Sequence, residues 1–317
     1  MRGMLERGFT TVRDVGGADW GLSRALDEAL LVGPRLLFGG KALSQTGGHG
    51  DGRSAGETLF EASPCSPGLG RVADGVDQVR AAARDELRKG AHHLKVMASG
   101  GVASPTDRID STQYSMDELR AVVEEADAAN RYVAAHAYTA RAANRALRAG
   151  VRSIEHGNLL DDETIRLLLE QDAYLVPTLV TYWALQQEGR DYGLPQDSWE
   201  KVDVVLGAGL SALERAATAG VRIAYGSDLL GGMHRHQAHE LALRARVQPA
   251  VDVLRSATTV AADLLGMSGE IGVVQTGAHA DFVLVDGDPL HDVGVLADPA
   301  ANLRLVIQAG RVVVDRR

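Results

Sequence analysis

The sequence predicts an α/β fold: a TIM-like (β/α)8 barrel that lacks its first strand–helix unit and is followed by a small β-rich tail. Short β-branched or apolar runs alternate with longer amphipathic segments rich in Ala, Leu, Arg and Glu, which is typical of βαβ units and a parallel sheet. Polar residues stand at the ends of four of these runs, as expected at the carboxyl face of such a barrel. After Gly266 the pattern changes to short runs separated by Gly and Asp turns, which indicates a separate β element.

Seven runs are predicted as barrel strands. Each is a stretch of β-branched or apolar residues next to a turn or a helical segment. In chain order they are "TTVRDV" from Thr10, "RLLFGG" from Arg35, "HLKVMA" from His93, "YVAAHAY" from Tyr132, "VRSIEHG" from Val151, "YLVPTL" from Tyr174 and "VRIAYGSD" from Val221. A closed barrel of this type has eight strands, so the sequence predicts that one unit is missing.

Capping signals predict helices between these strands. The segment "SMDELRAVVEEADAAN" begins at Ser115, and Glu118 three positions later completes a capping box. Two further segments, "TARAANRALRAG" and "DDETIRLLLEQDA", also open with capping residues, and Gly150 and Gly220 stand where helices should end before the next strand. The segment "PAVDVLRSATTVAADLLG" is predicted as one last helix that follows the seventh strand.

The chain is predicted to divide into two regions. Residues 1–266 would form the barrel, and residues 267–317 would form a C-terminal part of a β-sandwich, built from "GVVQTGAHADFVLVDGDPL" and "NLRLVIQAGRVVVDRR". A tail of about fifty residues rarely makes a stable sandwich alone. We therefore expect it either to pack on the barrel or to need partner strands that this sequence does not contain.

Composition restricts the class of partner. The 317 residues carry a net charge of −9 with no long basic block, which argues against nucleic acid. No apolar run is long enough for a membrane span, and the first residues lack the features of a signal peptide. The single cysteine, Cys65 in an expected loop, excludes an intramolecular disulfide and fits the cytoplasm. We expect a small-molecule substrate, and the open strand edges of an incomplete barrel also favour a homo-oligomer.

Four strand-end residues form the predicted site. Lys95, His136, His156 and Asp228 follow one another in strand order, and the carboxyl ends of barrel strands meet at one face. Neutral imidazole and carboxylate bind Zn²⁺ or a similar ion, which lowers the pKa of a bound water, and Asp228 is the predicted general base. A buried lysine is costly without a partner, but it becomes an oxygen ligand if CO₂ converts it to a carbamate.

Two further residues are predicted to act on the substrate oxygen. His49 in "TGGHGD" could polarise a carbonyl, and Tyr138 could donate its phenol to the same oxygen. The alternatives are an exposed loop histidine and a tyrosine that only covers the barrel rim. The segment Ser99–Gly101 would let a substrate approach the backbone.

Three other groups of polar residues are predicted to be structural. His92 and His93 would belong to the barrel wall, since they alternate with Lys95 and cannot all face the site. Arg13 and Asp14 would form an ion pair at the rim. His234 and His236 share a face only on a strand, and they follow Asp228 in a loop, so loop or substrate contact is preferred over metal binding.

The chain resembles the amidohydrolase superfamily, in particular its imidazolonepropionase-like and Xaa-Pro dipeptidase-like metal-dependent hydrolases. The resemblance spans nearly the whole chain and is carried by "GFTTVRDVGG", "SQTGGHGD", "HLKVMASGGVASP", "AAHAYT", "SIEHGNLLDD", "YLVPTL", "YGSDLLGGMHRHQ" and "GVVQTGAHADFVLVDGDPL". It implies one or two divalent metal ions, with zinc as the first choice, and hydrolysis of an amide or cyclic amide C–N bond. The implied substrate is a small dipeptide-like or N-acyl amino acid.

The resemblance also implies roles for the strand-end residues. A carbamate on Lys95 would bridge two metals, and His136 and His156 would bind the second metal. Asp228 would bind the first metal and carry the proton between water and the leaving nitrogen.

One part of the family pattern is missing from the sequence. Such enzymes open with half of the β-sandwich and a first barrel strand that ends in His-x-His, and nothing before Thr10 matches that strand. We therefore expect a truncated form of a longer ancestor or a start at an internal methionine, and the alternative function is a catalytically impaired fragment or pseudoenzyme. A metal-free phosphate-binding barrel is disfavoured, because Asp228 precedes the glycines of "GSDLLGGMHRHQ".

Overall fold

The computed structural model describes residues 1–58, 68–102, 104, 106–191, 193 and 196–317, so Cys65 lies outside the described residues. Its strands fall into three sheets. The main sheet is parallel and has the order β4-β3-β5-β6-β7-β8-β9, β1 and β2 form a parallel pair, and β10, β11 and β12 form an antiparallel sheet. The bounds are β1 Thr11–Asp14, β2 Arg35–Phe38, β3 Ala42–Ser44, β4 Gly70–Val72, β5 Leu94–Met97, β6 Val133–Thr139, β7 Ser153–Leu159, β8 Tyr174–Val176, β9 Arg222–Ile223, β10 Phe282–Val285, β11 Leu303–Gln308 and β12 Arg311–Asp315.

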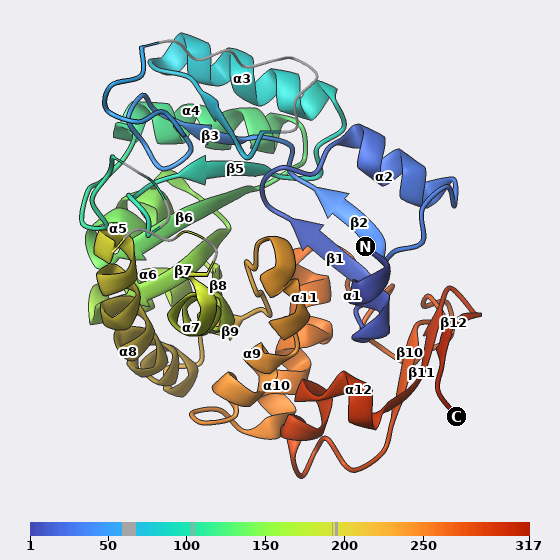
Figure 1. Cartoon of the computed structure of the whole chain (residues 1–317). Helices are drawn as coiled ribbons and strands as arrows, with labels where there is room; N and C mark the ends of the chain where they lie inside the picture. The colour runs from blue at the N-terminus through green and yellow to red at the C-terminus, as the bar shows by residue number, and fades with distance from the viewer. Residues whose placement is uncertain (59–67, 103, 105, 192, 194–195) are drawn as a thin grey trace.

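Helices surround the parallel strands, as Figure 1 shows. Their bounds are α1 Arg2–Glu6, α2 Trp20–Asp27, α3 Val76–Arg88, α4 Met116–Ala128, α5 Ala140–Ala149, α6 Asp162–Glu170, α7 Leu179–Glu188, α8 Gln196–Thr218, α9 His239–Arg244, α10 Ala250–Ala257, α11 Thr259–Leu264 and α12 Pro299–Asn302, with 3₁₀ helices η1 Gly231–His236 and η2 Val293–Ala297. No helix in the described part of the chain has the length and apolar character needed to cross a membrane. A seven-stranded parallel sheet covered by helices is the arrangement of a TIM-like, barrel-type α/β fold.

All seven predicted barrel runs contain a strand, namely β1, β2, β5, β6, β7, β8 and β9. β3 and β4, which have three residues each, were not predicted from the sequence. β2 pairs with β1, and β3 pairs with both β4 and β5. The backbone of His92 also donates to the carbonyl of Phe38, so β2 is joined to the segment that leads into β5.

β1, in the two-stranded sheet, and β9, at one end of the seven-stranded sheet, are the first and last of the predicted barrel strands. Within the described residues no ladder joins them. The helices α9, α10 and α11 lie on this side of the molecule (Figure 1), where Arg7 donates to Gln237 and the ring of Phe9 packs on Tyr225 at 5.4 Å. The predicted missing strand–helix unit would belong between β9 and β1, and it stays a prediction.

Local capping explains where the barrel helices begin and end. Ser115 and Glu118 form the predicted capping box of α4, and Thr139 caps α5, which ends at Gly150 with φ 100°. The last predicted helix is wrong as a single element, because the chain breaks into α10 and α11 at Thr258, whose φ and ψ are −127° and −93°. A Cβ on Gly272 would lie 2.6 Å from the carbonyl carbon of Thr258, so the tail packs closely against this break.

The tail contacts the barrel helices and also forms its own sheet. Val293 of η2 shares a hydrophobic cluster with Leu241 of α9 and Val253 of α10. The sheet of β10, β11 and β12 follows the expected change of pattern after Gly266. Its assignment to a β-sandwich, and the boundary between residues 266 and 267, stay predictions.

Candidate active site

The structure brings the four predicted strand-end residues together. Lys95 lies on β5, His136 on β6 and His156 on β7, and all three are at most 5% exposed. The rings of His136 and His156 have centroids 4.7 Å apart. Nε2 of His156 is 3.9 Å from Oδ2 of Asp228, whose side chain is 49% exposed. The cluster therefore has a buried floor and one carboxylate open to solvent.

Residues with left-handed backbone stand at the ends of three adjacent strands, β7, β8 and β9. They turn these strand ends toward the cluster. Alternation on β7 would place Ser153 and Glu155 on the inner face and His156 on the outer face. His156 instead has φ 77°, and Thr178 and Asp228, which follow β8 and β9, both have φ 46°. Such conformations cost about 1–3 kcal/mol each for residues other than glycine and persist where the surroundings hold them. The turn at His156 is what allows both Glu155 and His156 to face inward.

Hydrogen bonds fix the two histidines in opposite tautomers. Nε2 of His136 lies 3.2 Å from the carbonyl oxygen of Gly100, which can only accept, so Nε2 carries the proton and Nδ1 is free. Nδ1 of His156 lies 2.8 Å from Oγ1 of Thr178. Where the Thr178 oxygen accepts this bond, Nδ1 of His156 carries the proton. The free nitrogen of His156 is therefore Nε2, which faces Asp228.

Burial sets the charges of these groups. It lowers the pKa of His136 and of His156 well below the usual value, and the positive charge of Lys95 adds to the effect. Burial also lowers the pKa of Lys95 to about 8, against the attraction of Glu155 and Asp228. The pKa of Asp228 is raised to about 6, because the protein around its carboxylate disfavours the charged form although half of the side chain is exposed; Lys95 opposes the shift and Glu155 adds to it.

The donor set fits a divalent metal of the zinc type. Two neutral imidazoles each present an unprotonated nitrogen, and Lys95 has a pKa low enough to supply a neutral amine for reaction with CO₂. Across the described ranges no group of three or more His, Cys, Asp or Glu residues could hold an ion.

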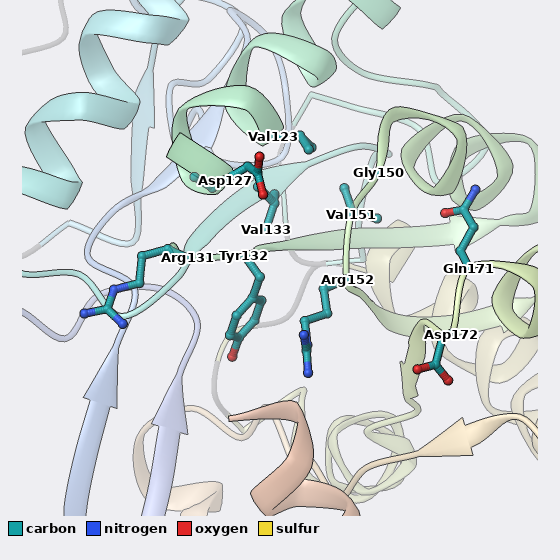
Figure 2. A pocket seen from close by; sticks show the side chains of 11 residues that line it. Val123, Asp127, Arg131, Tyr132, Val133, Gly150, Val151, Arg152, Gln171 and Asp172 are labelled. Carbon is teal, nitrogen blue, oxygen red and sulfur yellow. The ribbon is translucent and has the colours of Figure 1, made fainter. Parts of the chain in front are cut away.

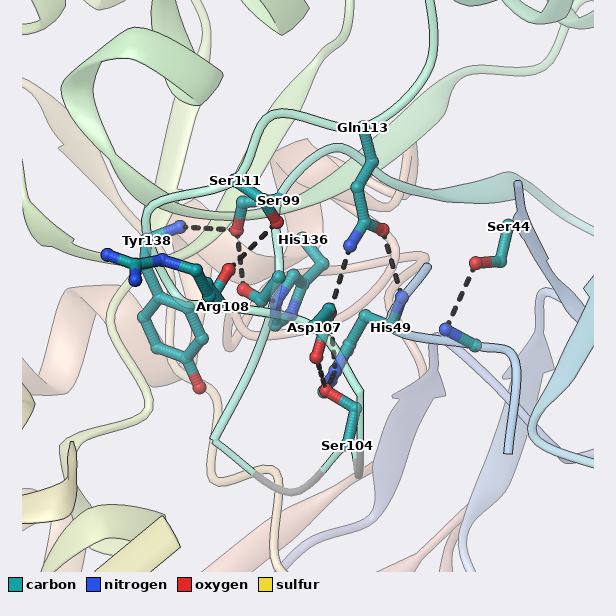
Figure 3. Close-up of polar contacts among 12 residues, drawn as sticks. Ser44, His49, Ser99, Ser104, Asp107, Arg108, Ser111, Gln113, His136 and Tyr138 are labelled. Carbon is teal, nitrogen blue, oxygen red and sulfur yellow. Dashed lines mark hydrogen bonds and ion pairs between the residues drawn. The ribbon is translucent and has the colours of Figure 1, made fainter. Parts of the chain in front are cut away.

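His49 and Tyr138 lie against the same histidines. The ring of His49 stacks on His136 at 4.2 Å, and the ring of Tyr138 stacks on His156 at 5.2 Å. Tyr182 donates its hydroxyl to the Tyr138 oxygen at 3.0 Å, which leaves the Tyr138 proton available to another acceptor. Burial raises the pKa of both phenols, so both are neutral donors at ordinary pH. Figure 3 shows His49 and Tyr138 on opposite sides of His136.

A buried ion pair crosses the barrel floor, and the sequence analysis missed it. Arg13 of β1 donates to both carboxylate oxygens of Glu155, at 2.9 and 2.8 Å, and to Ser153 at 3.2 Å. The prediction of a rim pair between Arg13 and Asp14 is wrong, because adjacent strand residues point to opposite faces and Asp14 accepts from the backbone of Gly16 and Ala18. Alternation in "TTVRDV" and "VRSIEHG" was the available signal for Arg13 and Glu155.

The glycines after Lys95 face protein rather than an open approach to the backbone. A Cβ on Gly100 would lie 1.9 Å from the carbonyl oxygen of Arg108, and a Cβ on Gly101 would lie 2.0 Å from the His49 ring. The expected approach of a substrate to the backbone of Gly100 and Gly101 is therefore blocked. These glycines allow two loops to pack closely.

The remaining histidines have other surroundings. His93 is fully buried and stacks on Tyr132 at 5.4 Å, and the backbone of Phe38 donates to Nδ1 of His92, as expected for barrel-wall residues. Nε2 of His236 is 2.6 Å from Glu188, and its ring packs on Trp183. These contacts place His236 outside the histidine cluster. They support its predicted role as a loop residue rather than as a replacement metal ligand.

A cavity of about 510 Å³ lies at the opposite end of the strands (Figure 2). Its lining includes Arg131, Tyr132 and Arg152, which precede β6 or β7. The Arg152 guanidinium lies 5.6 Å from the ring centroid of Tyr132 and 5.4 Å from that of Tyr174. In barrel enzymes this amino-terminal face serves stability, so we take the histidine cluster as the candidate site.

Comparisons with known proteins identify relatives of this chain. A family model described as the amidohydrolase family matches residues 1–313. Ochratoxinase from Aspergillus niger is 34% identical over 308 residues, which are 94% of this chain and 64% of that protein. A solved prolidase complexed with N-methylphosphonate-L-proline is 54% identical, with a TM-score of 0.97 over 100% of this chain and 78% of that one. A solved Xaa-Pro dipeptidase with methionine in its active site is 32% identical, with a TM-score of 0.87 over 97% and 75%. The chain thus spans 64% of the length of the curated relative.

Proposed function

The chain belongs to the amidohydrolase family, and from this premise we propose that it hydrolyses the amide C–N bond of a small dipeptide-like or N-acyl amino acid substrate with a metal-activated water. One observation carries the proposal. Two neutral histidines with free nitrogens on opposite ring positions, a buried lysine of lowered pKa and a carboxylate meet at the carboxyl ends of the strands.

Each residue of the cluster has a proposed task. His136 through Nδ1, His156 through Nε2 and a carbamylated Lys95 would hold a divalent ion, with zinc as the first choice, and Asp228 would bind an ion as well. The ion supplies a water of lowered pKa and a Lewis acid for the carbonyl oxygen. Asp228 accepts the proton of the attacking water and returns it to the leaving nitrogen, a role suited to a pKa of about 6. Tyr138 donates its phenolic proton to the carbonyl oxygen.

The substrate class rests on the relatives. A prolidase and a Xaa-Pro dipeptidase cover nearly the whole chain at 54% and 32% identity, and ochratoxinase covers 94% of it. Xaa-Pro dipeptides and N-acyl amino acids both place one amide bond next to a carboxylate, so one site of this kind could accept either. The cytoplasm remains the proposed location, supported by the single cysteine of the sequence.

A second candidate is a catalytically impaired fragment of the same family. Two observations on the described residues support it. β9 and β1 are not paired with each other, and no group of three His, Cys, Asp or Glu residues could hold an ion. In this case residues outside the present chain would supply the missing barrel unit and the His-x-His ligands of the first metal.

Metal content per chain separates the two candidates. We would measure it by plasma mass spectrometry after dialysis, for the protein, for Lys95→Ala and for Lys89→Ala, whose ammonium pairs with Asp85 and Glu86 on α3. Metal in the protein and in Lys89→Ala but not in Lys95→Ala, together with release of proline from Xaa-Pro dipeptides or of amino acids from N-acyl amino acids, supports hydrolysis. Absence of metal and of activity in all three supports the fragment.

A further inference from the structure

A closed ring of hydrogen bonds surrounds His49. It joins the loop after β3 to the loop after β5 and passes through Gln113, Asp107 and Ser104 (Figure 3). These three residues are between 2% and 9% exposed. The ring begins at the backbone amide of His49 and returns to Nδ1 of the same residue, so it fixes both the main chain and the side chain.

The directions of the bonds in the ring follow from one obligatory donor and one carboxylate acceptor. The backbone N–H of His49 can only donate, and it lies 2.9 Å from Oε1 of Gln113. This orients the Gln113 amide so that its NH₂ group donates to Oδ2 of Asp107 at 2.9 Å. An ionised carboxylate only accepts, so the hydroxyl of Ser104 donates to Oδ1 of Asp107.

The ring therefore determines the tautomer of His49. Ser104 has one proton, and that proton is used on Asp107. Its oxygen lies 2.8 Å from Nδ1 of His49, and this bond needs a proton from the imidazole. Nδ1 must carry it, and the neutral ring then keeps an unprotonated Nε2.

Packing holds the imidazole in that place. One face of the ring stacks on His136 at an interplanar angle of 21°. The ring is also so close to Gly101 that a Cβ there would lie 2.0 Å from its Cε1. The His49 loop is further tied by Ser44, which accepts from the backbone of Gly50 at 3.1 Å.

We infer that Ser104, Asp107 and Gln113 are positioning residues that hold His49 in its Nδ1–H tautomer beside His136. Nε2 of the neutral ring is then a hydrogen-bond acceptor, and His49 donates from Nε2 only as imidazolium. This changes the role expected for His49, because a neutral ring in this tautomer cannot polarise a carbonyl by donating from Nε2. The inference rests on the proposed function only for its effect on turnover.

The first test reads the tautomer directly. Protein labelled with ¹⁵N-histidine would be examined by long-range ¹H–¹⁵N correlation, with the His49 signals assigned by their loss in His49→Gln. We expect Nδ1–H in the parent and in Ser104→Thr, which keeps the hydroxyl. Ser104→Ala should give a mixed or Nε2–H ring. Asp110→Asn is the matched control, since Asp110 pairs with Arg108 in the same loop but is exposed, and it should leave the signals unchanged. An Nε2–H ring in the parent, or an unchanged ring in Ser104→Ala, overturns the inference.

The second test reads turnover. Ser104→Ala and Asp107→Asn should lower kcat about 10- to 100-fold, with a smaller change in KM, because a displaced group loses its alignment with the reacting atoms. Combined with His49→Gln, neither should lower kcat further, since residues that act through one group are not additive. An additive loss in the double variants overturns the positioning role. If the parent has no hydrolase activity, the proposed function fails, and the tautomer measurement still decides the inference.

Discussion

At the residue scale, the candidate site depends on backbone and side-chain groups that were not part of the strand-end pattern. Gly100 fixes His136 through its carbonyl, and Thr178 fixes His156 through its hydroxyl. Partners of this kind determine which imidazole nitrogen can bind a metal. Three of the residues that carry the site, His156, Thr178 and Asp228, also hold left-handed backbone. His156 and Thr178 therefore combine strained backbone with the hydrogen bond that places the imidazole proton.

Thr178→Val should weaken zinc binding about 10- to 100-fold. Valine keeps the shape of threonine but cannot accept the Nδ1–H proton of His156, so the tautomer that frees Nε2 is no longer favoured. Competition with a chromophoric chelator would measure the affinity. Thr178→Ser should bind nearly as well as the parent, and Thr181→Val, at another buried threonine of α7, is the control. Unchanged affinity in Thr178→Val would contradict the role given to this hydroxyl.

Glu240 makes the stability of the fold depend on pH. Its side chain is fully buried, and burial raises its pKa to about 7, with Arg244 opposing the shift. Because the folded pKa lies above the unfolded one, the stabilising contribution is full below the unfolded value and is lost as pH rises through the folded value. The protein should therefore lose stability between pH 5 and pH 8.

Glu240→Gln should remove this loss. Glutamine keeps an oxygen that can accept the backbone N–H of Val180, which now donates to Glu240 at 2.7 Å, and it carries no titrating group. The free energy of unfolding of the variant minus that of the parent should increase by roughly 2–3 kcal/mol from pH 5 to pH 8. Urea unfolding at the two pH values measures it, and a difference that does not change with pH would refute the assignment.

At the element scale, one carboxylate serves two helices. Glu118 accepts the backbone N–H of Ser115 at the start of α4, and its other oxygen accepts the backbone N–H of Gly75, the N-cap residue of α3, at 2.7 Å. Ser115→Ala removes one cap and should cost about 1 kcal/mol. Glu118→Ala should also release α3. Hydrogen exchange at the start of α3 should rise in Glu118→Ala but not in Ser115→Ala, and equal exchange in both would show that Glu118 does not stabilise α3.

The helices and strands also show how much of the fold could be predicted from the sequence. The seven long apolar runs and the helix caps were readable because each depends on neighbours in the chain, as the capping box of Ser115 and Glu118 does. The break at Thr258 was not, because it lies against Gly272 of the tail. β3 and β4 lie in "GGKALSQTGG" and "GLGRVAD", where glycines and polar residues interrupt the apolar run.

The candidate site, like the fold, was predicted from the sequence only in part. Alignment at strand ends predicted the meeting of Lys95, His136, His156 and Asp228, whereas the pair of Arg13 with Glu155 crosses the barrel from β1 to β7. Alternation along each strand could show that Arg13 and Glu155 face inward, but their pairing depends on how the strands curve around the barrel, which no local pattern encodes. The ring around His49 has the same origin, since it joins residues 49 and 113 from two loops.

At the scale of the whole molecule, the C-terminal sheet presents an apolar face. Phe282, Ile307 and Val312 are cross-strand partners on β10, β11 and β12, and Leu284 pairs with Leu305 on the same face. Phe282, Leu284 and Val312 are 41%, 53% and 54% exposed. A contiguous apolar patch on a sheet is typical of an interaction surface.

If the chain forms the homo-oligomer that its sequence predicts, we expect this face to be the contact. The double variant Leu284→Thr/Val312→Thr keeps β-forming residues but removes apolar area from both sides of a symmetric contact, so self-association should weaken at least about tenfold. Sedimentation at several concentrations measures it. Val274→Thr is the control, because Val274 is 83% exposed and lies outside the sheet. Association that is equally strong in the double variant, or a parent that stays monomeric, would contradict this contact.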